Sequence, residues 1–149
     1  MPMVELSVHL SAATDELTLN LNSLWLLVAA ALVLLMTPGV AFFYGGMVKA
    51  KSVISMMMMS FGTMGVVGVL WVLYGYGLAF GPALVPGFLG NPSTLFGLSG
   101  LLGVGEDGSL SPDLNGLAFA GFQATFAIIT VALISGAIAD RAKFGAWLI

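Results

Sequence analysis

Three phenylalanines within one long apolar stretch are the residues of this chain whose types and spacing best suit chemistry. Phe119, Phe122 and Phe126 stand at positions i, i+3 and i+7, so a helix would place them on one face, with Gln123 and Thr125 beside them. A cation that meets the face of an aromatic ring gains roughly 0.5–2 kcal/mol, so this group could select a small cation and exclude its water. Periodicity alone favours a plainer interpretation, in which the rings face lipid or pack in a core and Gln123 hydrogen-bonds a neighbouring helix.

A second aromatic group, Phe42, Phe43 and Tyr44, ends another apolar stretch and is followed by Gly45 and Gly46. Aromatic residues are common at the membrane boundary, and glycine commonly ends a helix. The alternative is a pore exit lined by Phe43 and Tyr44. Both interpretations place the group at the end of a membrane-spanning helix.

Other reactive arrangements are missing from the sequence. It has no nucleotide-binding loop, no nucleophile with a nearby base, no spacing typical of a metal site and no cysteine. The single histidine, His9, lies in the N-terminal segment, where a solvated side chain is the simplest interpretation. We therefore expect no enzymatic activity, no metal, no cofactor and no nucleic-acid partner.

The distribution of charge predicts the elements that carry these groups. Apolar residues make up 59% of the 149 residues and charged residues 7%, with a mean hydropathy of +1.07, whereas a soluble domain is typically about 25% charged. No Asp, Glu, Lys or Arg occurs in residues 17–48, 52–105 or 114–139, and each stretch exceeds the roughly 20 residues that cross a bilayer. Because helices satisfy their own backbone hydrogen bonds in lipid, we predict an all-α, polytopic helical membrane protein.

The pattern divides the chain into spans and connections. The predicted spans cover residues 21–44, 53–80 and 117–139, with the start of a fourth from residue 144. Residues 1–20 form an N-terminal tail, and residues 81–113 form a connection rich in glycine and proline. Pro38 should kink the first span, because it removes one backbone donor. A strip of three glycines on the second span, Gly62, Gly65 and Gly68, should let a neighbouring helix approach closely.

The basic residues predict the orientation. Lys49 and Lys51 follow the first span, and Arg141 and Lys143 follow the third. Cytoplasmic loops collect Lys and Arg, so a topology with the N-terminus outside places all four inside the cell. We therefore expect a multi-pass protein of the cell membrane, with residues 81–113 as an external loop.

The chain resembles the ammonium transporter family (Amt/Mep/Rh) in three stretches that keep the family's order and spacing. These stretches are TPGVAFFYGGMVKAKSVISMM, LWVLYGYGLAFG and FQATFAIITVALISGAIADRAKF, and the match covers nearly all of residues 20–149. The resemblance implies a fold of about eleven membrane helices, an external N-terminus and a homotrimer with a narrow pore in each protomer. It implies that ammonium is recruited at an outer aromatic vestibule and deprotonated, and that ammonia crosses a largely apolar pore. A cytoplasmic regulatory protein of the P-II type is a further candidate partner, besides the lipid bilayer.

The resemblance also implies roles for single residues. Phe126, in FQATF, would be a gating ring, and Phe122 would lie next to it at the vestibule. The six residues implied to line the pathway are Phe122, Gln123 and Phe126 on the outer side and Val40, Phe43 and Tyr44 at the lower pore and its cytoplasmic exit. All six are expectations that follow from the family's motifs.

The sequence departs from the family pattern in one large respect. The family's vestibule tryptophan, structural aspartate, second gate phenylalanine and pair of pore histidines lie on later helices and have no counterpart here. We therefore expect an N-terminal portion of a transporter that is active only within the complete protomer. Two other functions stay open: an ammonium sensor with a transporter-like membrane part coupled to a signalling domain, and a non-transporting membrane scaffold.

Overall fold

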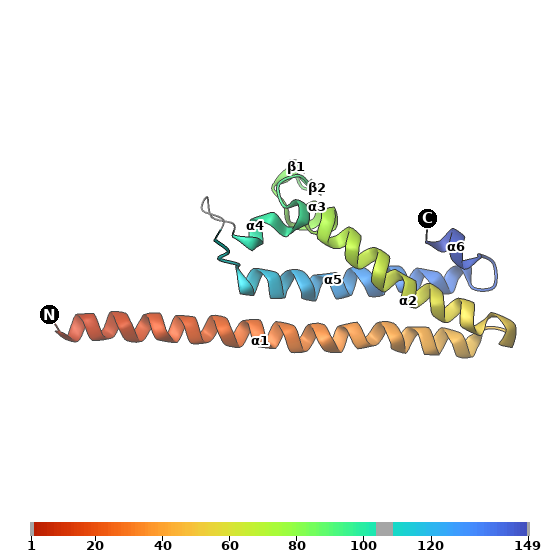
Figure 1. The fold of residues 1–149 in the computed structure, drawn as a ribbon, viewed down its shortest axis with the longest axis horizontal. Helices are drawn as coiled ribbons and strands as arrows, with labels where there is room; N and C mark the ends of the chain where they lie inside the picture. Colours follow the sequence, from red (N-terminus) through yellow and green to blue (C-terminus); the bar gives the residue numbers. More distant parts are fainter. Residues whose placement is uncertain (1, 104–108, 149) are drawn as a thin grey trace.

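Three long helices dominate the computed structural model, which describes residues 2–103 and 109–148. They are α1 (Pro2–Met47), α2 (Val53–Leu70) and α5 (Leu114–Ile134). Helices α1 and α5 run in the same direction, α2 returns in the opposite direction, and each of the three packs against the other two (Figure 1). The segments Met3–Met47, Ala50–Phe80 and Leu114–Ile138 are each long and apolar enough to cross a membrane. The predicted all-α, polytopic class is confirmed.

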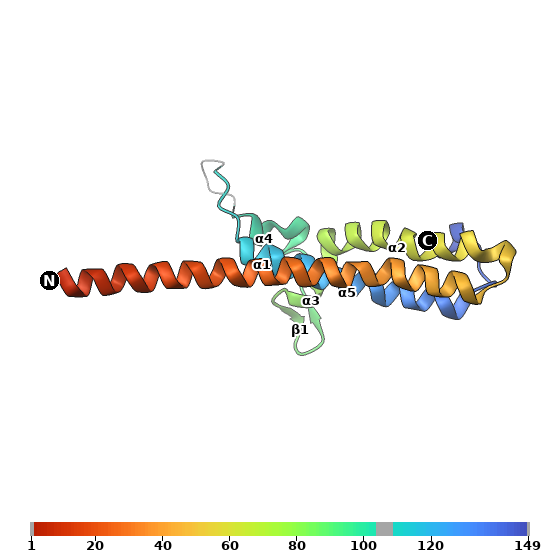
Figure 2. The same cartoon turned by 90° about the horizontal axis from the view of Figure 1, so that it is seen from below.

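Helix α1 continues through the segment that the sequence suggested as a tail. It has 46 residues, which corresponds to about 69 Å at 1.5 Å per residue. Its N-terminal part projects beyond α2 and α5 (Figure 2). The reason is local: no glycine or proline occurs between residues 3 and 37, and Pro2 stands at the first helical position, where its missing N–H costs no bond. No break in the helix marks the expected boundary near residue 21.

The expected kink at Pro38 is not seen. The helix runs through Pro38 without interruption, and α1 is a nearly straight rod in both ribbon views. Thr37 and Ala41, on either side of Pro38, are both 0% exposed. We attribute the straight course to this packing, since α2 and α5 hold the helix where proline removes one hydrogen bond.

The helical segment that begins with α2 contains a wide turn near its C-terminal end. Helix α2 passes into a π-helical turn, η2 (Trp71–Gly75), and then into α3 (Tyr76–Phe80). The N–H of Tyr76 donates to the carbonyl of Trp71, five residues earlier, as a π-turn requires. The Trp71 indole N–H donates to the backbone carbonyl of Ala120 on α5 at 3.1 Å, which ties this turn to the neighbouring helix.

The connection between α3 and α5 is built from short elements. An antiparallel pair, β1 (Ala83–Val85) and β2 (Leu89–Gly90), is followed by the 3-10 turn η3 (Phe96–Leu98) and by α4 (Ser99–Leu102). Gly90 must be glycine, because a Cβ there would lie 2.5 Å from the carbonyl oxygen of Gly77. Asp113 caps α5, and its Oδ1 accepts the N–H of Gly116 at 2.9 Å. Two acids expected in the external loop, Glu106 and Asp107, lie outside the described residues.

The chain after α5 folds back onto α2. A 3-10 turn, η4 (Ser135–Ile138), leads through a short loop to α6 (Phe144–Trp147). The Trp147 indole N–H donates to the carbonyl of Met59 at 3.1 Å. A Cβ on Gly62 would lie 3.0 Å from a methyl carbon of Leu148, whereas Gly65 and Gly68 meet nothing within 4 Å. The glycine strip on α2 therefore serves close helix approach at one of its three positions in the described structure.

Small side chains fill the seam between the three helices. Five of the buried residues carry hydroxyls, and three of these donate to carbonyls one turn earlier: Thr63 to Ser60, Thr125 to Phe122 and Ser135 to Ala132, each at 2.6 Å. These bonds satisfy three hydroxyls without a partner helix, whereas the buried hydroxyls of Thr37 and Ser60 have no hydrogen-bond partner among the described residues. Apart from glycines, the buried residues are Thr37, Ala41, Met56, Met59, Ser60, Thr63, Tyr76, Ala118, Ala120, Thr125, Ile128, Ile129, Ala132 and Ser135.

Candidate functional site

The outer aromatic pair stands on α5. The rings of Phe122 and Phe126 meet edge to face, with centroids 5.0 Å apart and an angle of 79° between the planes. Phe126 keeps 42% of its surface exposed, and Phe122 is half-buried. Such an edge-to-face pair leaves one ring free to offer its face to a ligand. Gln123 is half-buried, and its amide makes no hydrogen bond within the described part of the chain.

Phe119 belongs to a different group of rings. It meets Phe80 of α3 edge to face at 5.2 Å, and Phe80 in turn contacts Tyr76 at 5.1 Å and Trp71 at 6.4 Å. The helical spacing correctly placed three phenylalanines on one helix, but their ring contacts separate Phe119 from the Phe122–Phe126 pair. Trp71, Tyr76 and Phe80 stand close together in the sequence, but such clustering is also typical of a membrane boundary and does not by itself predict their contact with Phe119.

The inner aromatic group stands at the end of α1. The rings of Phe43 and Tyr44 lie 5.9 Å apart, and the hydroxyl of Tyr44 donates to the carbonyl of Leu133 on α5 at 3.2 Å. A Cβ on Gly136 would lie 2.6 Å from Cζ of Tyr44, so a larger residue here would push the ring away from this turn. Val40, one turn earlier on α1, is half-buried.

Tyr44 also borders a cavity of about 320 Å³ at this end of the molecule. The other lining residues are Met47, Val48, Gly136, Ala139 and Asp140. The cavity therefore combines the apolar side chains of Met47 and Val48, at and just after the end of α1, with the carboxylate of Asp140.

The two aromatic groups lie at different depths of the same helix pair. Two cross-contacts fix how α1 and α5 are aligned: Ser23 with Asn115 at 3.5 Å, and Tyr44 with Leu133 at 3.2 Å. With this alignment Phe126 lies level with residues 34–37 of α1. Phe43 is then displaced from Phe126 by about 9–14 Å along the axis, at 1.5 Å per residue. Within residues 2–103 and 109–148, no three His, Asp or Glu side chains gather as they would around a metal ion.

Residues 24–149 match the family model described as the Ammonium Transporter Family. The chain belongs to the ammonium transporter family. It is 56% identical over 140 residues to an ammonium transporter of Mycobacterium tuberculosis, in an alignment that covers 86% of this chain and 29% of the relative. The ammonium transporters of Bacillus subtilis and Aquifex aeolicus are 48% and 45% identical, over 131 and 129 residues. These two alignments also cover 86% of this chain, and 30% and 29% of the relatives.

This member of the ammonium transporter family spans less than a third of the length of the curated relatives it matches. The resemblance seen in the sequence is confirmed, and three apolar helices together with these relatives make the chain part of a multi-pass membrane protein. The relatives are named as transporters rather than as enzymes. The roles of the six pathway residues stay predictions.

Proposed function

We propose that the complete protein carries ammonium across the cell membrane and that this chain supplies the first part of the pathway. Family membership over residues 24–149 carries the proposal. The placement of the two aromatic groups supports it, because they lie at separate depths on the α1–α5 pair. The function resides in the complete protomer, which we propose assembles as a homotrimer.

The outer pair would act on the ammonium ion before it enters. Faces of Phe122 and Phe126 would offset part of the cost of dehydration through cation–π attraction, and Gln123 would offer an amide oxygen. An uncompensated charge is costly in a dry apolar channel, so the ion would transfer one proton to water at the outer entrance and continue as ammonia. Phe126, the more exposed ring, would then act as the gate.

The inner group would line the lower pathway and its exit. Val40, Phe43 and Tyr44 present apolar and aromatic surface, and the tethered Tyr44 borders the cavity near the end of α1. With the N-terminus outside, this exit opens to the cytoplasm. The inner loops, Lys49–Lys51 and Asp140–Lys143, are where a P-II-type regulatory protein would dock.

Flux measurements on the complete protein test the proposal. The full-length protein is reconstituted in proteoliposomes, and the uptake of labelled methylammonium is compared with that of protein-free vesicles. We expect uptake that rises with the amount of protein and is inhibited by added ammonium. Binding of ammonium without flux would favour a sensor, and neither binding nor flux from correctly folded protein would favour a scaffold.

A further inference from the structure

A second cavity at the inner end of the molecule shares Asp140 with the cavity beside Tyr44. Its volume is about 130 Å³, and it lies where the α1–α2 connection meets the loop after η4. None of the six pathway residues lines it. The lining residues are Lys51, Ser52, Ser55, Met56, Met59, Asp140 and Ala142.

The polar lining of this cavity has two sides of opposite charge. Lys51 contributes an ammonium group, with the hydroxyls of Ser52 and Ser55 near it in the chain. Asp140 contributes a carboxylate from a segment far away in the sequence. In the described part of the chain, Lys51 and Asp140 form no ion pair within 4.0 Å, and neither serine hydroxyl forms a hydrogen bond. All four groups are therefore available to a ligand that carries both charges.

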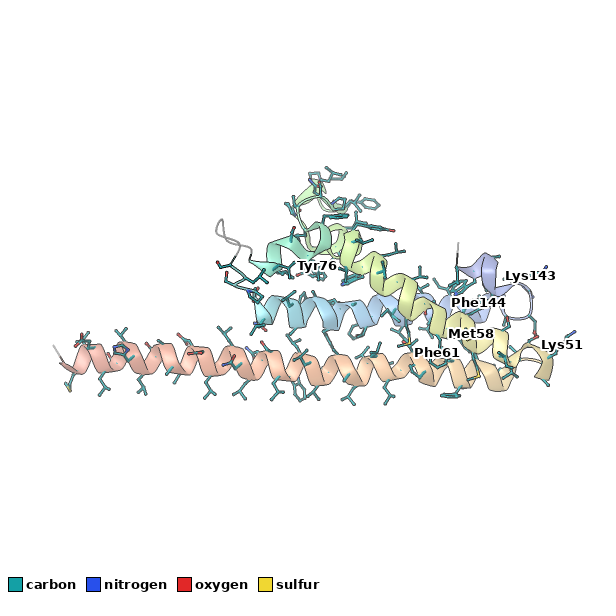
Figure 3. The ribbon with its side chains drawn as sticks, in the orientation of Figure 1. Lys51, Met58, Phe61, Tyr76, Lys143 and Phe144 are labelled. Carbon is teal, nitrogen blue, oxygen red and sulfur yellow. The ribbon has the colours of Figure 1, made fainter. Side chains whose placement is uncertain are left out.

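The cavity lies at the depth of lipid headgroups. Lys51 lies two residues before α2 begins at Val53, and Asp140 lies two residues after η4 ends at Ile138, so both charges stand at the ends of the apolar helices. Figure 3 shows Lys51 and Lys143 together at this end of the molecule. The apolar part of the lining comes from Met56 and Met59, which lie deeper along α2 and are each 2% exposed. The polarity of the lining thus changes from charged to apolar in the direction of the membrane interior.

We propose that this cavity binds the headgroup of a zwitterionic phospholipid with a primary ammonium, such as phosphatidylethanolamine. The lipid phosphate accepts hydrogen bonds from Lys51, Ser52 and Ser55, and the headgroup ammonium donates to the carboxylate of Asp140. Met56 and Met59 close the apolar side of the cavity. A site for a purely anionic group would not include a carboxylate, because like charges raise the cost of binding.

The site differs from a general attraction between basic loops and acidic lipid. That attraction depends on the total charge near the surface and adds about 1 kcal/mol for each basic residue, whatever its exact place. The proposed site depends on Lys51, which lines the cavity, and not on Lys49, which is also exposed but does not line it. The chain therefore provides its own matched control.

Lipid titration of the complete, delipidated transporter in detergent tests the site. Native mass spectrometry gives the dissociation constants of phosphatidylethanolamine and phosphatidylcholine, whose quaternary ammonium cannot donate a hydrogen bond. We expect phosphatidylethanolamine to bind more tightly. Lys51→Gln should weaken its binding about tenfold, the effect of losing a charge-assisted bond, and Lys49→Gln should weaken it less than about twofold. Asp140→Asn should remove the preference between the two lipids.

Several outcomes would overturn the site. If Lys49→Gln and Lys51→Gln weakened lipid binding equally, the binding would depend on the general surface charge and not on this cavity. If the preference for phosphatidylethanolamine survived in Asp140→Asn, the headgroup ammonium would not bind Asp140. Soluble phosphoethanolamine competing as well as the lipid would remove the lipid from the proposal. If both cavity variants lowered the unfolding temperature by the same amount without changing lipid binding, Lys51 and Asp140 would stabilise the fold and would not bind lipid. The readout is binding, so it stays valid whether or not the protein transports ammonium.

Discussion

The hydroxyl of Tyr44, near the end of α1, donates a hydrogen bond to the carbonyl of Leu133 in the last turn of α5, at 3.2 Å. Gly136 makes room for the ring in the turn that follows. Near the start of α5, Ser23 and Asn115 contact each other at 3.5 Å. Two contacts at opposite ends thus hold the parallel helices in one alignment, and this alignment determines how far Phe126 stands from Phe43.

Tyr44→Phe should destabilise the complete protein by about 0.5–1.5 kcal/mol, the net value of one hydrogen bond. The ring and its packing remain, so the loss isolates the hydroxyl. Thermal unfolding in detergent measures the change. Tyr74→Phe is the control, because the hydroxyl of Tyr74 makes no hydrogen bond among the described residues. Equal shifts in the two variants would contradict a tether at Tyr44.

Gly136→Ala should cost more than the loss of the hydroxyl. The new methyl group would lie 2.6 Å from Cζ of Tyr44 and would force the ring away from α5, which we expect to cost about 1–3 kcal/mol. Gly121→Ala is the matched control in α5, where a Cβ meets nothing within 4 Å. That variant should be neutral or stabilising, since alanine favours helix over glycine by up to about 1 kcal/mol. A neutral Gly136→Ala would show that Tyr44 does not lie against this turn.

Trp71→Phe should loosen the contact between the π-turn and α5. The substitution removes the indole N–H that donates to the Ala120 carbonyl and leaves an aromatic ring in place. We expect a loss of about 0.5–1.5 kcal/mol in the free energy of unfolding and faster hydrogen exchange at residues 71–80. The control is Trp25→Phe, because Trp25 is 73% exposed. Unchanged hydrogen exchange in the Trp71 variant would contradict a stabilising hydrogen bond between Trp71 and Ala120.

Phe126→Ala in the complete protein should change methylammonium uptake, or selectivity among cations, by roughly 2- to 30-fold. This range is the rate equivalent of a cation–π contact of about 0.5–2 kcal/mol. Proteoliposome uptake at equal protein content measures it. Phe42→Ala serves as the control, since Phe42 is 63% exposed and is not assigned to the pathway. If uptake and selectivity matched those of the unsubstituted protein, Phe126 would not act as the gate.

The number of membrane-spanning helices and their approximate positions could be predicted from the sequence, because a segment in lipid must satisfy its own backbone hydrogen bonds. Uncharged stretches of sufficient length become helices, and the structure has apolar helical segments at Met3–Met47, Ala50–Phe80 and Leu114–Ile138. The helical state of residues 2–20 was not foreseen, although the lack of glycine and proline there allowed it. Polarity suggested a tail, but polarity does not decide between helix and coil.

Contacts between distant segments could not be foreseen from spacing. The spacing of Phe119, Phe122 and Phe126 shows only that they share a helix, and the partner Phe80 arrives from a helix some forty residues earlier, 5.2 Å from Phe119. The bond from Trp71 to Ala120 likewise depends on how α2 and α5 are aligned. The prediction of a kink at Pro38 was wrong for the same reason, because packing against neighbouring helices overrides the tendency of proline to kink a helix.

The π-turn at Trp71–Gly75 affects the ring cluster of Trp71, Tyr76, Phe80 and Phe119. The contacts in this cluster depend on how many residues the turn contains as well as on which residues they are. A helical turn that holds one additional residue rotates everything after it by about 100° relative to a regular helix. Here that rotation brings Tyr76 and Phe80 onto the side that faces Trp71 and Phe119. Deleting a single residue between positions 71 and 75 would turn these rings away from α5, even though every aromatic side chain were retained.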